Sequence, residues 1–163
     1  MAETITTTSN SDEDGMSAVV YSKYGGPDVL EFKPIGKPVI EDDEVLVRVH
    51  AAGVDRGVWH LMMGLPYPIR LVGHGIRAPK NPVLGMDVAG VVEAVGKNVT
   101  RFQSGDEVFG IGTGSYADYA RAHEDKLAPK PANLSFKQAA AVAISGLTAL
   151  QGLRDHGRIE PGQ

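Results

Sequence analysis

The sequence predicts a mainly β fold with short helices, in which the strands form a partly closed barrel. Its 163 residues are 42% hydrophobic, which is enough for one core. The 20 glycines favour many turns over long helices. Short apolar stretches alternate with glycine-rich corners, and glycine permits the bends that a curved sheet requires.

Residues 1–15 are polar and acidic, and we predict a disordered tail because such a stretch cannot offset the entropy lost on ordering. Four acidic residues in it account for the whole net charge of −4: Glu3, Asp12, Glu13 and Asp14. The remainder is near neutral and has no stripe of Lys and Arg. We therefore expect no nucleic-acid partner and no membrane partner.

The first elements are short strands. Structure should begin at Met16, with a strand over 18–21 that ends at the turn 25–27. A second strand over 29–34 should pair back on the first. In residues 45–52, apolar side chains recur at every second position, which predicts a strand with one buried face.

A short helix should follow this strand. Asp55 is placed to cap its N-terminus, and the helix should run towards Met63 with Gly64 closing it. Residues 65–82 are expected to be a loop.

The second half begins with three more strands, over 87–95, 107–111 and 116–122. Ser135 and Gln138 fit a capping box that opens an alanine-rich helix through Val142. Gly146 should interrupt it before a second helix over 147–153, and the segment 159–163 should be a loop.

Cysteine is absent from the chain, which excludes disulfides, thiolate nucleophiles and cysteine-ligated zinc. The five histidines, at 50, 60, 74, 123 and 156, show no metal-ligand spacing. No signal peptide or membrane-spanning run is evident, so we expect a soluble, cytoplasmic protein. We interpret Asp42-Asp43 and the run 123–126 as solvated turn charges.

Three motifs carry a resemblance to a known family: Ala-Ala-Gly-Val-Asp at 51–55, Pro-Val-Leu-Gly-Met-Asp-Val-Ala-Gly from Pro82, and Ser-Gly-Asp-Glu-Val-Phe-Gly at 104–110. They resemble the GroES-like catalytic domain of the medium-chain dehydrogenase/reductases. Residues 139–150 resemble the helices that lead into that family's nucleotide domain. The resemblance implies a catalytic domain over 16–134 and linker helices over 135–163, truncated before a Rossmann domain.

The zinc enzymes of this family bind their metal where this sequence has Asp55, Met86-Asp87 and Ile144. A thioether and an isoleucine cannot supply the basic donors that catalytic zinc needs. The four-cysteine lobe is also missing between Phe109 and Tyr116. The sequence therefore resembles the zinc-free quinone-oxidoreductase branch, close to reticulon-interacting mitochondrial oxidoreductases.

That resemblance implies hydride transfer from NADPH, or alternatively NADH, to a small-molecule quinone, enone or carbonyl. The full-length protein would be a homodimer, and this fragment alone should be inactive. A stand-alone GroES-like module without catalysis, or a truncated product, is the alternative function. Without further chain, apolar surface should be exposed around Val142, Ile144, Leu147 and Leu150, and should promote self-association.

The resemblance also implies site residues. Asp55 and Thr148 match positions that contact the nicotinamide, although each also fits a helix-capping role. His60 is the candidate catalytic residue, as a proton relay, with a structural role as the alternative. Trp59 is a candidate substrate-binding residue that could instead be core. Tyr67 is a second such candidate that could simply pack.

Overall fold

The structure, a computed structural model, describes residues 15–160 and residue 162. The predicted tail therefore lies outside the described residues, except for Gly15, which begins the first strand.

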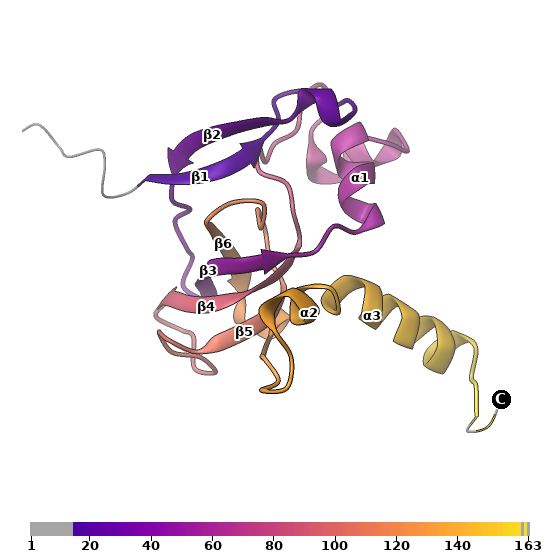
Figure 1. Cartoon of the computed structure of the whole chain (residues 1–163). Helices are drawn as coiled ribbons and strands as arrows, with labels where there is room; N and C mark the ends of the chain where they lie inside the picture. The colour runs from indigo at the N-terminus through magenta and orange to yellow at the C-terminus, as the bar shows by residue number, and fades with distance from the viewer. Residues whose placement is uncertain (1–14, 161, 163) are drawn as a thin grey trace, which may run out of the picture.

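Strands β1 (Gly15–Val20) and β2 (Glu31–Gly36) form a two-stranded antiparallel sheet, as the sequence predicted (Figure 1). β2 begins two residues later than expected because Pro27–Val29 forms a 3-10 turn that buries Val29. Backbone bonds tie this sheet to the rest of the molecule. Val19 N donates to Tyr116 O over 2.8 Å, and Tyr21 N donates to Pro82 O over 2.9 Å.

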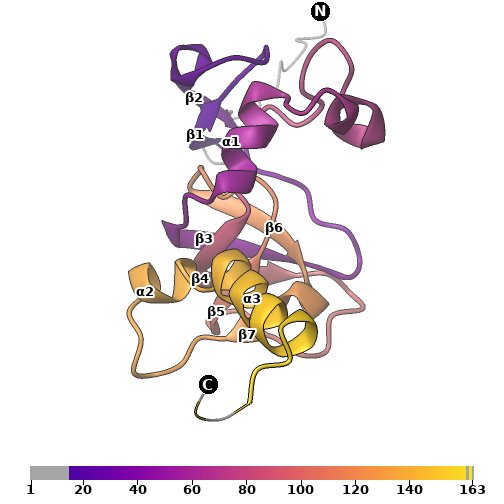
Figure 2. The same cartoon turned by 90° about the vertical axis from the view of Figure 1, so that its right-hand side faces the viewer.

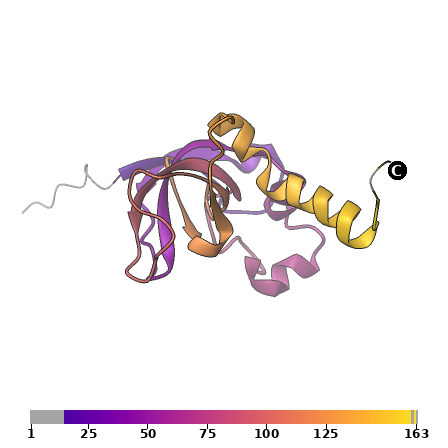
Figure 3. The same cartoon turned by 90° about the horizontal axis from the view of Figure 1, so that it is seen from below.

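The second sheet contains five strands, and every neighbouring pair in it is antiparallel. Its spatial order is β6-β3-β4-β5-β7. The bounds are β3 (Glu44–Ala52), β4 (Asp87–Val95), β5 (Glu107–Ile111), β6 (Tyr119–His123) and β7 (Leu127–Pro129). The sheet curls into the predicted partly closed barrel, visible from below in Figure 3.

The main core follows from the period-two pattern. Val45 and Val47 are fully buried, whereas Arg48 is exposed. The remaining residues of this cluster come from all the neighbouring strands and their connections: Val88, Val92, Phe102, Val108, Ala120, Ala122 and Leu127. Gly90 permits the close approach of β3 and β4, because a Cβ there would lie 2.1 Å from Arg48 O.

Two strand predictions need correction. The strand expected over 116–122 begins only at Tyr119, because Tyr116 lies in the segment that bonds to β1. The 3-10 turn Glu124–Lys126 and the short β7 were not predicted. Three residues such as Leu127–Pro129 carry too little periodicity to mark a strand.

The segment 65–82 is not wholly a loop, since Arg70–His74 forms one π-helical turn. The Arg70 guanidinium carbon lies 4.3 Å from the Tyr24 ring centre and 4.9 Å from the Tyr67 ring centre. Arg70 also donates from Nε to Gly64 O over 2.9 Å. The contact with Tyr24 comes from a distant part of the sequence, so the local pattern could not indicate it.

The C-terminal helices differ from the prediction at Gly146. The capping box at Ser135 and Gln138 is confirmed and opens α2 (Phe136–Ala140). α3 (Ala143–Leu150) then runs through Gly146 without interruption and continues into a π-helical turn at Gln151–His156. A glycine within a helix costs about 1 kcal/mol but does not end it. We call residues 143–156 the C-terminal arm, which projects away from the sheet (Figures 1 and 3) and points toward the viewer in Figure 2.

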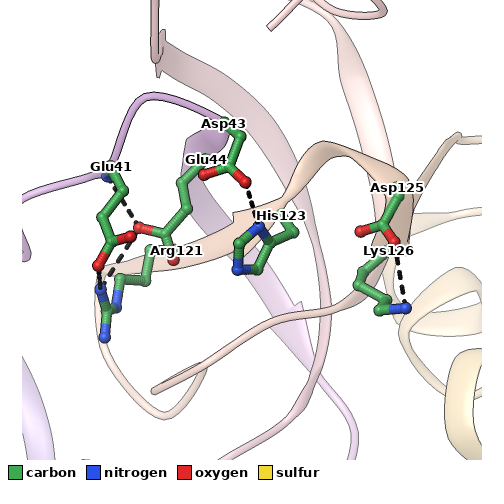
Figure 4. A network of polar contacts seen from close by, with 7 residues as sticks. All are labelled: Glu41, Asp43, Glu44, Arg121, His123, Asp125 and Lys126. Carbon is green, nitrogen blue, oxygen red and sulfur yellow. Dashed lines mark hydrogen bonds and ion pairs between the residues drawn. The ribbon is translucent and has the colours of Figure 1, made fainter. Parts of the chain in front are cut away.

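Charged side chains join β6 to the turn before β3 (Figure 4). The buried Glu44 carboxylate lies 3.3 Å from Arg121 Nη1, and His123 Nδ1 lies 3.1 Å from Asp43 Oδ2. The Asp43 and His123 side chains are more than half exposed, as expected for solvated turn charges, so this pair adds little stability. Within residues 15–160, no helix is long and apolar enough to cross a bilayer.

Candidate active site

Asp55 caps helix α1 (Arg56–Met63), as the sequence predicted. Its Oδ1 accepts hydrogen bonds from Gly57 N over 2.5 Å and from Val58 N over 3.2 Å. Gly64 closes the helix in the left-handed conformation, with a φ of 62°. The cap fixes the direction of the carboxylate at the end of β3.

The second oxygen of Asp55 is the unusual feature of this carboxylate. Oδ2 is buried and has no hydrogen-bond partner among the described residues. The residue as a whole is only 9% exposed. An unpaired buried polar atom costs about 1–3 kcal/mol, so Oδ2 is a costly acceptor that the described residues leave unused.

Asp87 is a second buried carboxylate, 2% exposed, at the first position of β4. Its Oδ1 accepts a hydrogen bond from Ile144 N over 2.8 Å, which anchors the start of α3 to the barrel. Burial raises the pKa of Asp87; the Ile144 N–H acts against this shift, and the negative charge of Asp55 adds to it. Asp87 is therefore a group that holds a proton more readily than an ordinary carboxylate.

Tyr116 belongs to the same cluster. Its hydroxyl donates to Gly53 O over 3.1 Å. Burial raises the pKa of Tyr116 to about 12, and the charges of Asp55 and Asp87 act in the same direction. The phenol thus remains protonated at neutral pH. Sequence reasoning missed this residue, since a tyrosine near a strand has no pattern that marks a site.

Gly53 allows these groups to come together. A Cβ at this position would lie 2.6 Å from Ala140 O and 2.8 Å from the Asp87 Cβ. The end of β3 therefore packs directly on α2 and on the start of β4. Ser115, which is 1% exposed, adds a further buried hydroxyl without a partner in the described part of the chain.

In this cluster Asp55 offers an unused acceptor oxygen among the described residues, Asp87 holds a proton more readily than an ordinary carboxylate, and Tyr116 keeps its phenol proton. The negative charge of Asp55 adds to the raised pKa of Asp87. The sequence singled out Asp87 only because it stands where the zinc enzymes of the family that it resembles bind their metal. A charged residue at the start of an otherwise apolar strand was the available clue.

His60 and Trp59 lie on α1, but the structure does not join them to Asp55 by a hydrogen bond among the described residues. His60 Nδ1 lies 3.1 Å from Leu65 O, a contact across the end of the helix. Trp59 is 37% exposed and meets the His60 ring edge-on at 5.0 Å. The alternative that Trp59 is a core residue is therefore wrong.

Tyr67 and Thr148 are both exposed. Tyr67 is 68% exposed and its described ring contact is with Arg70. The expectation that Thr148 sits at a helix N-terminus is wrong, because α3 begins at Ala143 and Gly146 does not interrupt it. Thr148 nevertheless follows Ile144 by four residues and so shares its helix face.

Met86 and Ile144 occupy two of the positions where zinc enzymes place ligands, and neither is a basic donor. No group of three His, Asp or Glu side chains converges to hold a metal within the described ranges 15–160 and 162.

Comparisons with known proteins agree with this geometry. The alcohol dehydrogenase GroES-like domain matches residues 41–132. A quinone oxidoreductase of Sus scrofa is 36% identical over 151 residues, covering 91% of this chain and 44% of the relative. The chain thus spans less than half the length of this relative.

Two solved structures are also similar. Escherichia coli quinone oxidoreductase complexed with NADPH matches with a TM-score of 0.77 and 29% identity, over 90% of this chain and 43% of that one. CurK enoyl reductase matches with a TM-score of 0.81 and 27% identity, over 91% and 45%.

Proposed function

Because the chain belongs to the alcohol dehydrogenase GroES-like family, in the quinone-oxidoreductase-like group of the medium-chain dehydrogenase/reductases, we propose that it supplies the catalytic domain of an oxidoreductase. The proposed reaction is zinc-free hydride transfer from NADPH to a quinone, an enone or another carbonyl acceptor. NADH remains the alternative reductant. The buried and unpaired Oδ2 of Asp55 is the observation that carries this proposal.

The residues present fit a nicotinamide cofactor. Its carboxamide offers N–H donors, and Asp55 Oδ2 is a buried acceptor that lacks one. Asp55 and the exposed hydroxyl of Thr148 are the residues proposed to hold the ring. The cofactor, when bound, supplies the hydride, while the protein orients the reactants and excludes water.

The remaining groups are proposed to act on the acceptor. Asp87, whose pKa is raised by burial, can hold a proton near the reacting oxygen. Tyr116, whose hydroxyl stays protonated and donates to Gly53 O, is proposed to hold the end of β3 in place beside Asp87. Trp59 and Tyr67 are proposed walls of the acceptor pocket, and His60 is a proposed proton relay.

The proposal is tested by kinetics on the complete protein that contains this chain, with NADPH and a panel of quinones and enones. Asp55→Ala should lower kcat/KM by about 10-fold or more, as expected when a hydrogen bond to a charged group is lost. Asp55→Asn keeps a capping oxygen but replaces the Oδ2 acceptor with an N–H donor, so it should preserve the helix cap and still lower kcat/KM.

Ser135→Ala is the matched control, since it also removes an N-cap, and the side-chain hydrogen bonds of Ser135 are with Gln138 and not with Asp55. It should cost about 1 kcal/mol of stability and leave kcat/KM unchanged. The proposal fails if the complete protein reduces no acceptor with either nicotinamide. It also fails if Asp55→Ala and Ser135→Ala have equal effects.

Three narrower proposals accompany this function. The 163-residue chain alone should bind NADPH weakly, which calorimetry measures. The complete protein should be a homodimer by light scattering. It should fractionate with the cytoplasm.

A further inference from the structure

A cavity of about 360 Å³ lies between helix α1, the segment 73–81 and the residues that lead into β4. Tyr21, Leu61 and residues 83–86 line one part of it, and residues 111–113 complete the wall. Its size is at the lower end of the roughly 300–1,000 Å³ typical of small-molecule sites. The cavity would thus hold a ligand of modest size.

Much of the lining is apolar. Tyr21 and Leu84 are buried members of a hydrophobic cluster on which Leu61 and Met86 also pack. The Met86 methyl group reaches the N-terminus of α1, since a Cβ on Gly57 would lie 3.2 Å from it and 2.7 Å from Asp55 Oδ1. Met86 therefore lies between this cavity and the Asp55 carboxylate.

The polar residues that line the cavity offer hydrogen-bond donors. Burial, together with Tyr24, raises the pKa of Tyr21 to about 12, so its hydroxyl keeps its proton. That hydroxyl makes no hydrogen bond in the described part of the chain. Asn81 uses Oδ1 to accept from Val83 N over 3.1 Å, which leaves its Nδ2 free to donate.

The charge of the surrounding segment also favours a negatively charged ligand. Residues 56–86 contain four Lys or Arg and neither Asp nor Glu, in a chain whose net charge is −4. None of the four forms an ion pair with a described carboxylate. Lys80 and His74 line the cavity itself, and among the described residues no acidic side chain lines it. A ligand that satisfies these groups must bring acceptors and negative charge.

We propose that this cavity binds the carboxylate end of a small organic acid with an apolar body, held by Lys80, Tyr21 and Asn81. A carboxylate accepts from all three donors. The apolar lining favours an organic acid over inorganic phosphate, because phosphate has no apolar surface to bury. The identification of this acid with the acceptor, an enone or quinone that carries a carboxylate, rests on the proposed function.

Binding is measured on the 163-residue chain by NMR titration with 3-benzoylacrylate, an aryl enone acid. Its methyl ester is the neutral control, and inorganic phosphate is the second arm. The absence of cysteine prevents thiol addition to the enone. The acid should perturb amide resonances of residues 73–86 and 111–113, and should bind about fivefold more tightly than the ester.

Two variants assign the site. Lys80→Met keeps the aliphatic stem and should weaken acid binding about fivefold, without affecting the ester. Tyr21→Phe should weaken acid binding about threefold. Lys97→Met is the matched control, because Lys97 pairs with Asp42 at the opposite end of β4. It should change nothing.

Equal affinity for acid and ester, tighter binding of phosphate, or an unaltered Lys80→Met variant would each overturn the proposal. The measurement needs no cofactor and no turnover. Binding of the acid by a protein whose complete form reduces nothing would therefore refute the proposed function and leave this site intact. Reductase activity without binding of the acid would refute this site and leave the proposed function intact.

Discussion

The curled sheet and the C-terminal arm place similar apolar residues in opposite environments. Val47 and Val88 of the sheet are completely buried. Leu147, Leu150 and Leu153 of the arm are 49%, 46% and 54% exposed. An apolar pattern therefore produces a core only where a second layer covers it. The sheet curls around its own apolar face, whereas the arm presents an uncovered face.

The largest expected effect is the difference in unfolding free energy lost on truncating a side chain in the sheet and one in the arm. Val47→Ala should lower the free energy of unfolding by about 2 kcal/mol, because it leaves a cavity in the main core. Leu147→Ala should change it by no more than about 0.5 kcal/mol, since the side chain is half exposed. Urea denaturation followed by circular dichroism measures both. Equal losses would show that the arm belongs to the same cooperative unit.

A smaller effect, a dependence of stability on pH, should come from Asp87, which connects the two regions by accepting a hydrogen bond from Ile144 N. The pKa of Asp87 is raised in the folded state, so the native protein binds this proton more tightly than the unfolded chain does. Its contribution to stability is present below the ordinary aspartate pKa and is lost as pH rises through the raised folded pKa.

Asp87→Asn keeps an oxygen that can accept a hydrogen bond from Ile144 N, but its amide side chain does not titrate. The difference in unfolding free energy between wild type and this variant should therefore fall as pH increases across that window. Urea melts at a series of pH values measure this difference. A difference that stays constant with pH, or grows with it, would contradict the assigned burial of Asp87.

The smallest effect on stability concerns the face of the arm. The prediction that Val142, Leu147 and Leu150 are exposed is confirmed, although Ile144 is only partly so. The 163-residue chain should self-associate through this face, and Leu147→Glu with Leu150→Glu should reduce its mass in light scattering without lowering its unfolding midpoint. A monodisperse wild-type monomer would show that the exposed leucines do not drive association.

Much of the barrel could be predicted because its information is local. The alternation in 45–52 marks β3, and Asp55 with Gly64 marks both ends of α1. The capping box at Ser135 was equally direct. In each case a side chain acts on backbone within a few residues, so the sequence alone specifies the outcome.

The errors do not share one cause. Gly146 has a poor helix propensity, yet α3 continues through it, with Gly146 N bonded to Val142 O over 2.7 Å, so one weak helix former did not end the helix. The turn at Arg70–His74 involves the ring of Tyr24, from a distant part of the chain, as well as that of the nearby Tyr67. The shift in the start of β6 depends on how Tyr116 pairs with β1.

The sequence by itself determined the strand pattern, the helix caps, the absence of thiol chemistry and the family. Only the tertiary structure decided that Asp87 and Tyr116 join Asp55 and that one Asp55 oxygen has no donor among the described residues. It also decided that Tyr21, Lys80 and Asn81 line one largely apolar cavity. Caps and strand faces depend on neighbours along the chain. Burial and charge coupling depend on atoms that folding brings together from residues up to about a hundred positions apart.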